Sequence, residues 1–187
     1  MTDPSASFKS LASYYQLVAK VDRFAKGVAE RYPDALVCKR GCDACCTHIG
    51  VSAVEALALA LAVARLPAEE AATLRERAAR MQGGKACPLL ADGGCLLYAA
   101  RPILCRSQGL PLLVKEGGGE RVDHCPLNFQ QVEAISGEAV LNLEILNQAL
   151  AAINHFCLQE LETRGAKLPP RLPLAQALQL ELDFSDS

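Results

Sequence analysis

Apolar residues recur at helical spacing in the N-terminal part of the chain. The pattern runs from Ser7 to Ala35, and Pro33 closes it. Its apolar positions are Leu11, Tyr15, Val18, Phe24 and Val28. The spacing therefore predicts a long amphipathic helix over residues 7–35.

Two more helices are predicted in the next third of the chain. Ser52 and Glu55 have the spacing of a capping box ahead of an Ala/Leu run that reaches Leu66. Pro67 suits the first turn of a following helix over 68–82, which two glycines end.

Turn residues predict short β-segments further on. Asp92 and Gly93 lie between short apolar runs, as in a tight hairpin. Residues 110–115 and 121–125 are predicted as two short strands around the glycines 117–119.

The C-terminal third is predicted to be mainly helical. A fourth long helix is expected from Val132 or Gly137 to Arg164. An extended connector over 168–173 then leads to a short apolar segment, 174–182. The fold class expected is mainly α: a small helical domain with a loop-rich cysteine cluster and short β-hairpin segments.

Length and composition narrow the function classes. The chain has 187 residues and a net charge of -2, which favours a single domain over 1–187 that binds no nucleic acid. The most apolar stretch, 56–64, is too short to span a membrane. The N-terminus has an acidic residue, Asp3, and no apolar run that would indicate a secretory signal, so we expect a cytoplasmic protein.

Nine cysteines are the distinctive feature of the composition. Structural disulfides would not persist in a reducing cytosol, so metal binding or thiol chemistry must account for most of them. Cys157 stands apart, on the apolar stripe of the fourth predicted helix, and is expected to be a core residue. His155, two residues away, is expected on the opposite side of that helix.

The other eight cysteines have the features of metal ligands. Three of them lie in a polar loop where Gly41 permits a tight backbone. Since adjacent side chains have difficulty occupying two corners of one tetrahedral ion, Cys45 and Cys46 are expected to serve different metals or different atoms of one cluster. Eight thiolates would complete two four-ligand sites or one multinuclear assembly. The predicted ligands are Cys38, Cys42, Cys45, Cys46, Cys87, Cys95, Cys105 and Cys125.

Basic groups near these cysteines are expected to offset the charge of the thiolates. Arg101 and Arg106 bracket Cys105 in a predicted helical turn and are the favoured candidates. Lys39 and Arg40 are more simply read as surface residues. The helix expected just after the cysteine loop would also lower thiolate pKa values through its dipole.

Two histidines have more than one interpretation. His48 follows the cysteine loop and His124 precedes Cys125. Each is either a metal ligand, a hydrogen-bond donor to a ligand, or a solvent-exposed residue.

Taken together, the motifs resemble the bacterial CxxCxxCC cysteine-cluster family of YkgJ-like zinc- or iron-chelating domains. The resemblance covers roughly residues 36–127. It rests on the cysteines of 38–46, then Glu55, Cys87-Pro88, Gly94-Cys95, Arg101-Pro102, Cys105-Arg106 and Cys125-Pro126. It implies a metal-binding core flanked by helices, and similarity to larger members adds the expectation of an iron–sulfur cluster. One departure is that three residues separate Cys38 from Cys42, where the short form of the pattern has two.

Three functions therefore remain open at the level of sequence. The cysteines hold iron, as an iron–sulfur or other polynuclear centre; or they hold structural zinc, with the helices as a surface for a protein partner; or they form a metal-free thiol redox sensor. A Cys42/Cys45 dithiol pair is the redox alternative, but the chain lacks the βαβ context of thioredoxin-like motifs. No phosphate-binding loop, nucleophile elbow or zinc-protease motif is present, so the sequence leaves open whether the protein is an enzyme.

Overall fold

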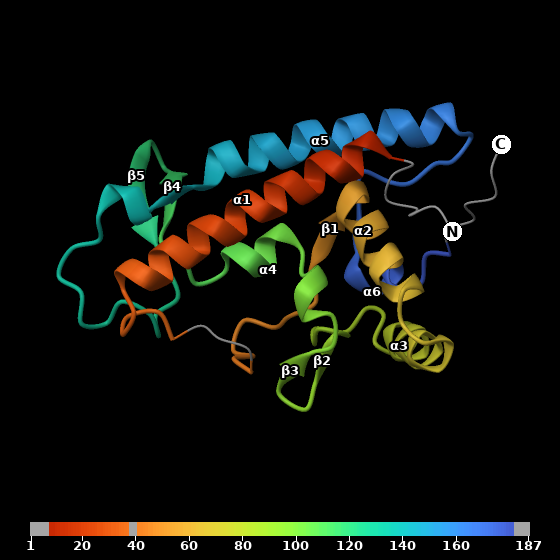
Figure 1. Ribbon diagram of the computed structural model, residues 1–187, viewed down its shortest axis with the longest axis horizontal. Helices are drawn as coiled ribbons and strands as arrows, with labels where there is room; N and C mark the ends of the chain where they lie inside the picture. The colour runs from red at the N-terminus through yellow and green to blue at the C-terminus, as the bar shows by residue number, and fades with distance from the viewer. Residues whose placement is uncertain (1–7, 38–40, 182–187) are drawn as a thin grey trace. The chain divides into compact units, whose positions relative to one another are not determined.

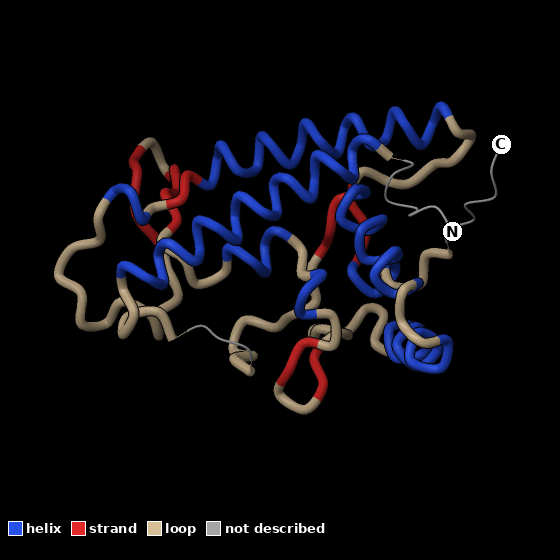
Figure 2. The backbone as a smooth tube through the Cα atoms, in the orientation of Figure 1, coloured by secondary structure: helices blue, strands red, loops and turns tan. Residues whose placement is uncertain are grey.

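The computed structural model describes residues 8–37 and 41–181, in which helices predominate (Figures 1 and 2). The chain divides into two units by its internal contacts. The first unit is Met1–Tyr14, Arg40–Pro102 and Ile153–Ser187; the second is Tyr15–Lys39 and Ile103–Ala152. The two long helices, α1 (Lys9–Arg31) and α5 (Leu143–Thr163), contribute segments to both units. Six α-helices among the described residues confirm the mainly α class. None of the described helices is both long and apolar enough to cross a membrane.

The first unit is built around helix α2 (Ala53–Ala64), which is buried along most of its length. Its predicted capping box is present: the backbone N–H and the hydroxyl of Ser52 donate to the Glu55 carboxylate at 2.9 and 2.8 Å. Helix α3 (Ala68–Arg80) follows Pro67, as predicted. Small and branched side chains of both helices pack into one apolar core.

The segment expected as an extended connector is a strand in this unit. Strand β7 (Arg171–Pro173) pairs antiparallel with β1 (Gly50–Ser52), and α6 (Leu174–Ala177) follows it. The pairing satisfies backbone groups that an unpaired connector would leave to water.

The predicted hairpin at Asp92 and Gly93 is confirmed. Strands β2 (Leu90–Ala91) and β3 (Gly94–Cys95) pair antiparallel across these two residues. Asp92 has a φ of 48° and Gly93 a φ of 72°, the left-handed backbone that a two-residue hairpin turn requires.

The second unit contains α4 (Ile103–Ser107) and a small sheet. Strand β4 (Leu112–Glu116) pairs antiparallel with β5 (Gly119–Asp123), which confirms the two predicted strands, and parallel with β6 (Leu141–Asn142).

The predicted start of the fourth long helix, at 132 or 137, is wrong. A 3-10 turn (Gly137–Ala139) and β6 come first, and α5 begins at Leu143. The Asn142 side chain accepts the backbone N–H of Ile145 at 3.1 Å, which caps the helix at this point.

Helix α1 confirms the first predicted helix but not every apolar position. Tyr14, Val21 and Val28 are buried, whereas Tyr15 is 36% exposed. The buried positions are seven residues apart, two helical turns, so Tyr15 is rotated about 100° away from them.

Cys157 is fully buried on α5, as predicted, and His155 is exposed. Burial raises the pKa of the Cys157 thiol from 9.0 to about 11, although the nearby Ser10 hydroxyl lowers it. Cys157 is therefore a protonated core residue at neutral pH.

We expect Cys157→Ala to keep the full metal content of the wild type and to lower the free energy of unfolding by about 1 to 2 kcal/mol at neutral pH. Because the folded-state pKa is raised, the benefit of the thiol is complete below pH 9.0 and is lost as the pH rises to about 11. Urea unfolding of both proteins across this range should show their difference shrinking. Loss of metal from the variant would contradict the assignment of Cys157 to the core.

Candidate metal centre

The β2–β3 hairpin and the turn that leads into it carry two cysteines, Cys95 and Cys87. The Leu90 N–H closes this turn by donating to the Cys87 carbonyl at 3.1 Å. Burial raises the pKa of both thiols, and the nearby backbone amides of Leu89 and Leu90 at Cys87, and of Leu97 at Cys95, oppose it. Cys95 also raises the pKa of Cys87, so the two thiols lie close to each other, as the sequence predicted.

A loop returns a third cysteine to this hairpin. An antiparallel bridge pairs Thr47 with Ala86, which brings their neighbours Cys46 and Cys87 together. Cys46 and Cys95 also pack against the apolar core that contains Cys87. Gly41, with a φ of 98°, supplies the left-handed turn that opens the loop.

The thiol of Cys46 lies near other acidic groups. Burial is the main cause that raises its pKa, and Cys87, Cys95, Asp43 and Cys42 raise it further. Burial likewise raises the pKa values of Cys87 and Cys95, against the opposing effect of nearby backbone amides. A cation near Cys46 would favour its thiolate over the protonated thiol.

The expected lowering of a thiol pKa by a helix dipole is not found at Cys46. Helix α2 begins only at Ala53, and β1 lies between it and the cysteine loop. Because a helix dipole acts within about one turn, burial determines the pKa of Cys46 instead.

The thiols are neighbours, but they are not arranged in the coordination geometry of a single metal ion. Among residues 8–37 and 41–181, no three thiol, imidazole or carboxylate groups are placed to hold one metal ion. Cys42 and Cys46 lie on a loop, whereas Cys95 belongs to a paired strand, so a bound ion would draw the loop toward the hairpin. The donor set itself fits a thiophilic metal such as zinc or iron.

Cys45 and Cys46 have different surroundings. Cys45 is exposed, whereas Cys46 is half-buried against the core. That they serve different metal atoms stays a prediction.

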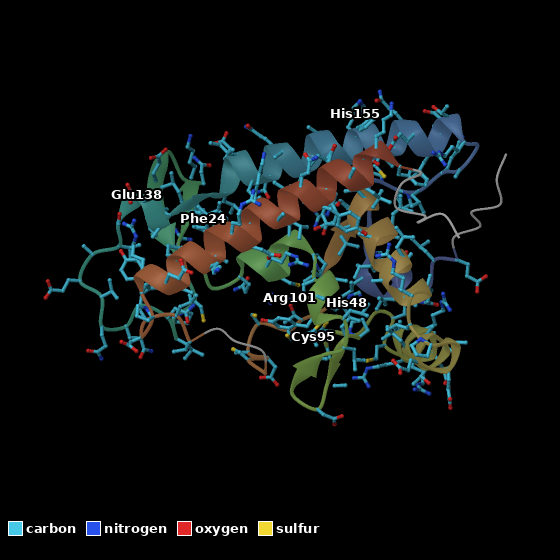
Figure 3. All side chains as sticks on the ribbon, viewed as in Figure 1. Phe24, His48, Cys95, Arg101, Glu138 and His155 are labelled. Carbon is cyan, nitrogen blue, oxygen red and sulfur yellow. The ribbon has the colours of Figure 1, made fainter. Side chains whose placement is uncertain are left out.

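The two arginines favoured by the sequence have different partners. The Arg101 guanidinium lies 3.7 Å from the centre of the Tyr98 ring, and its Nε donates to the Tyr98 carbonyl at 3.0 Å. Its charge lowers the pKa of Cys95, and Figure 3 shows both residues in the same region. Arg106, in the second unit, donates through Nη1 to the Asp22 carboxylate at 2.7 and 2.9 Å.

Three other predicted ligands lie in the second unit or outside the described residues. Cys105, on α4, and Cys125, after β5, belong to the second unit. Cys38, Lys39 and Arg40 lie outside the described residues. Ligand roles for these cysteines stay predictions.

Both histidines make specific contacts and are half-buried. The backbone N–H of Ala175 donates to His48 Nε2 at 3.3 Å. His124 Nδ1 donates to the Cys125 carbonyl at 3.0 Å, and its ring packs against Phe129. The Nε2 atom of His48 is thus directed at α6, and the imidazole of His124 packs beside the Cys125 backbone.

One residue at the site was missed by sequence reasoning. Arg77, on α3, donates from Nε to the Pro88 carbonyl at 2.8 Å and from Nη2 to the Leu90 carbonyl. It lies ten residues before Cys87, and its only local signal is a basic side chain in the last turn of a helix.

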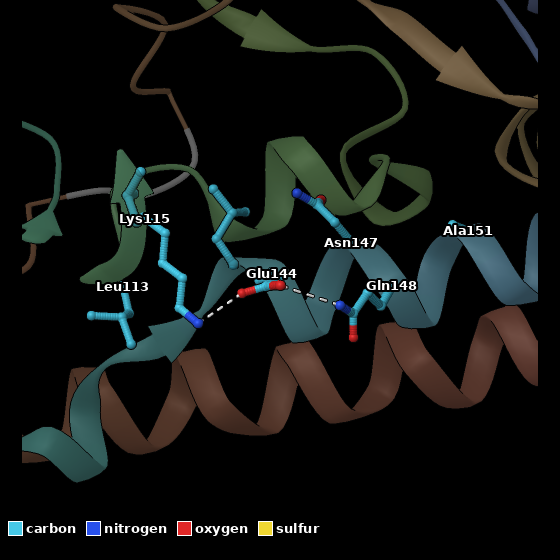
Figure 4. A pocket seen from close by; sticks show the side chains of 8 residues that line it. Leu113, Lys115, Glu144, Asn147, Gln148 and Ala151 are labelled. Atoms are coloured by element: carbon cyan, nitrogen blue, oxygen red, sulfur yellow. Dashed lines mark hydrogen bonds and ion pairs between the residues drawn. The ribbon is translucent and has the colours of Figure 1, made fainter. Parts of the chain in front are cut away.

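The second unit has a pocket of about 580 Å³ between β4 and α5 (Figure 4). Its walls carry an exposed ion pair, in which Lys115 Nζ lies 3.0 Å from the Glu144 carboxylate. No cysteine or histidine lines it. The cysteine chemistry therefore does not involve this pocket.

Comparison with known proteins agrees with the cysteine pattern. Residues 37–126 match the family model CxxCxxCC, described as "Putative zinc- or iron-chelating domain". This range contains all eight predicted ligands. The search of curated proteins and the search of solved structures gave no match.

Proposed function

We propose that the chain binds zinc or iron, as the match of residues 37–126 to the CxxCxxCC zinc- or iron-chelating domain supports, with one site formed by Cys42, Cys46, Cys87 and Cys95. The observation that carries the proposal is that Cys46, Cys87 and Cys95 meet at one apolar core, where the bridge between Thr47 and Ala86 brings Cys46 beside Cys87.

The local charge balance supports a thiolate site for a divalent ion. Four thiolates and one divalent cation leave a net charge of about -2. Arg77 lowers the pKa of Cys87 and Arg101 lowers that of Cys95, so each hairpin cysteine has one guanidinium beside it. The two guanidinium groups balance the remaining charge.

The metal would supply different chemistry according to its identity. Zinc would stabilise the loop–hairpin junction, and an iron–sulfur or other polynuclear iron centre would supply electron transfer. We propose Cys38, Cys45, Cys105 and Cys125 as further ligands, and Arg106, which follows Cys105 in the sequence, as a group that offsets the thiolate charge.

A metal-free thiol sensor has less support. Redox-sensing cysteines are reactive because their pKa is low. The pKa values of Cys46, Cys87 and Cys95 are all raised, chiefly by burial. In the absence of metal these thiols would be protonated and slow to react.

Elemental analysis and an absorption spectrum of the untagged, anaerobically purified protein test this proposal. We expect more than one zinc or iron per chain. A sulfur-to-iron band in the visible region would indicate iron, and a colourless protein with stoichiometric zinc would indicate zinc. Less than one metal atom per chain would contradict the proposal.

A further inference from the structure

We propose that Arg77 is a positioning residue for the metal site: its guanidinium holds the backbone of the turn at residues 87–90, which carries Cys87, in place. This inference rests on the function proposed above. It assigns a role to a helix, α3, that lies before the hairpin motif in the sequence.

Arg77 forms hydrogen bonds to two carbonyls in the turn that follows Cys87. Its Nε donates to the carbonyl of Pro88 at 2.8 Å, and its Nη2 donates to the carbonyl of Leu90. The turn between these two carbonyls is closed by the Leu90 N–H, which donates to the Cys87 carbonyl at 3.1 Å. A planar guanidinium that binds both carbonyls therefore fixes the backbone of the turn that begins at Cys87.

Helix α3 holds this guanidinium in place. Leu74 is 4% exposed and Ala78 fully buried, and both pack in the core that also contains Cys87. Helix α3 and the turn that begins at Cys87 thus pack against the same hydrophobic core.

The same helix offers a matched control. Arg80, three residues further on, is exposed and pairs with Glu76 at 2.8 Å. Such surface pairs contribute little to stability. A change at Arg80 removes the same charge from α3 without touching the bonds to the turn.

The experiment uses the full-length protein loaded anaerobically with Co2+, from which a competing chelator withdraws the metal. We compare the wild type with Arg77→Gln, Arg77→Lys and Arg80→Gln, and we record the sulfur-to-cobalt absorption band per bound ion. Arg77→Gln should weaken cobalt binding about 10- to 100-fold and shift the band. Arg77→Lys keeps the positive charge but lacks the planar guanidinium that binds two carbonyls, so its cobalt affinity should lie between those of Arg77→Gln and the wild type. Arg80→Gln should match the wild type.

Circular dichroism of each loaded variant separates a folding defect from a site defect. If Arg77→Gln loses helix content, the cobalt affinity of Arg77→Lys relative to the wild type decides whether Arg77 positions the metal site. Equal affinity and equal bands in the wild type and in the folded Arg77 variants would overturn the role of Arg77 alone. Failure of the wild type itself to bind cobalt would instead overturn the proposed function.

Discussion

Cys87→Ser is expected to remove the hairpin-bound metal and to cause a large loss of stability in the metal-loaded protein. Cys87 is buried and lies beside Cys46. Metal binding that occurs only in the folded state adds its free energy to that of folding, about 4 kcal/mol when free metal exceeds its Kd a thousandfold. Metal analysis and urea unfolding, each with and without chelator, measure the effect.

The matched control for Cys87→Ser is Cys157→Ser, which places the same serine at another buried cysteine. The control should keep its metal and retain the stabilisation that chelator removes. Wild-type metal content in Cys87→Ser, or equal metal loss in both variants, would contradict the site.

The adjacent cysteines provide the second prediction with a large effect. Cys46 lies beside the hairpin, whereas Cys45 is exposed. As ligands of two different metals, Cys46→Ser and Cys45→Ser should each lose about one metal atom per chain. The double variant should then bind less metal than either single variant. Because a ligand's free energy is also folding free energy, each variant should unfold at lower urea concentration than the wild type.

The result that would contradict this division is a double variant indistinguishable from Cys46→Ser in metal content. Both residues would then act on one metal, or Cys45 would not be a ligand. Elemental analysis of the three variants prepared in parallel decides this.

Local signals in the sequence were sufficient for several elements. Asp92 and Gly93 predicted the hairpin because few residues tolerate their backbone conformation, and Ser52 and Glu55 predicted the start of α2 because the capping box is local. Cys157 was placed in the core from helical periodicity alone.

Features that depend on tertiary contacts could not be predicted in the same way. The start of α5 was placed too early because β6 forms only by pairing with β4. Tyr15 was assigned to the buried stripe because the sequence does not show which of two adjacent tyrosines faces the core.

In the candidate site, too, features that depend on tertiary contacts could not be predicted from the sequence. Spacing predicted Cys46, Cys87 and Cys95 as ligands; the structure packs all three against one apolar core, and their ligand role stays a prediction. Arg77 was missed because its contact with the cysteine turn exists only once α3 has packed against the core.

The central claim is that cysteine thiolates of the loop and the hairpin hold a zinc or iron atom. X-ray absorption at the metal edge of the anaerobically purified full-length protein tests it most directly. We predict a coordination shell made mainly of sulfur, with metal–sulfur distances of about 2.3 Å for zinc. A shell made of nitrogen and oxygen would contradict the account.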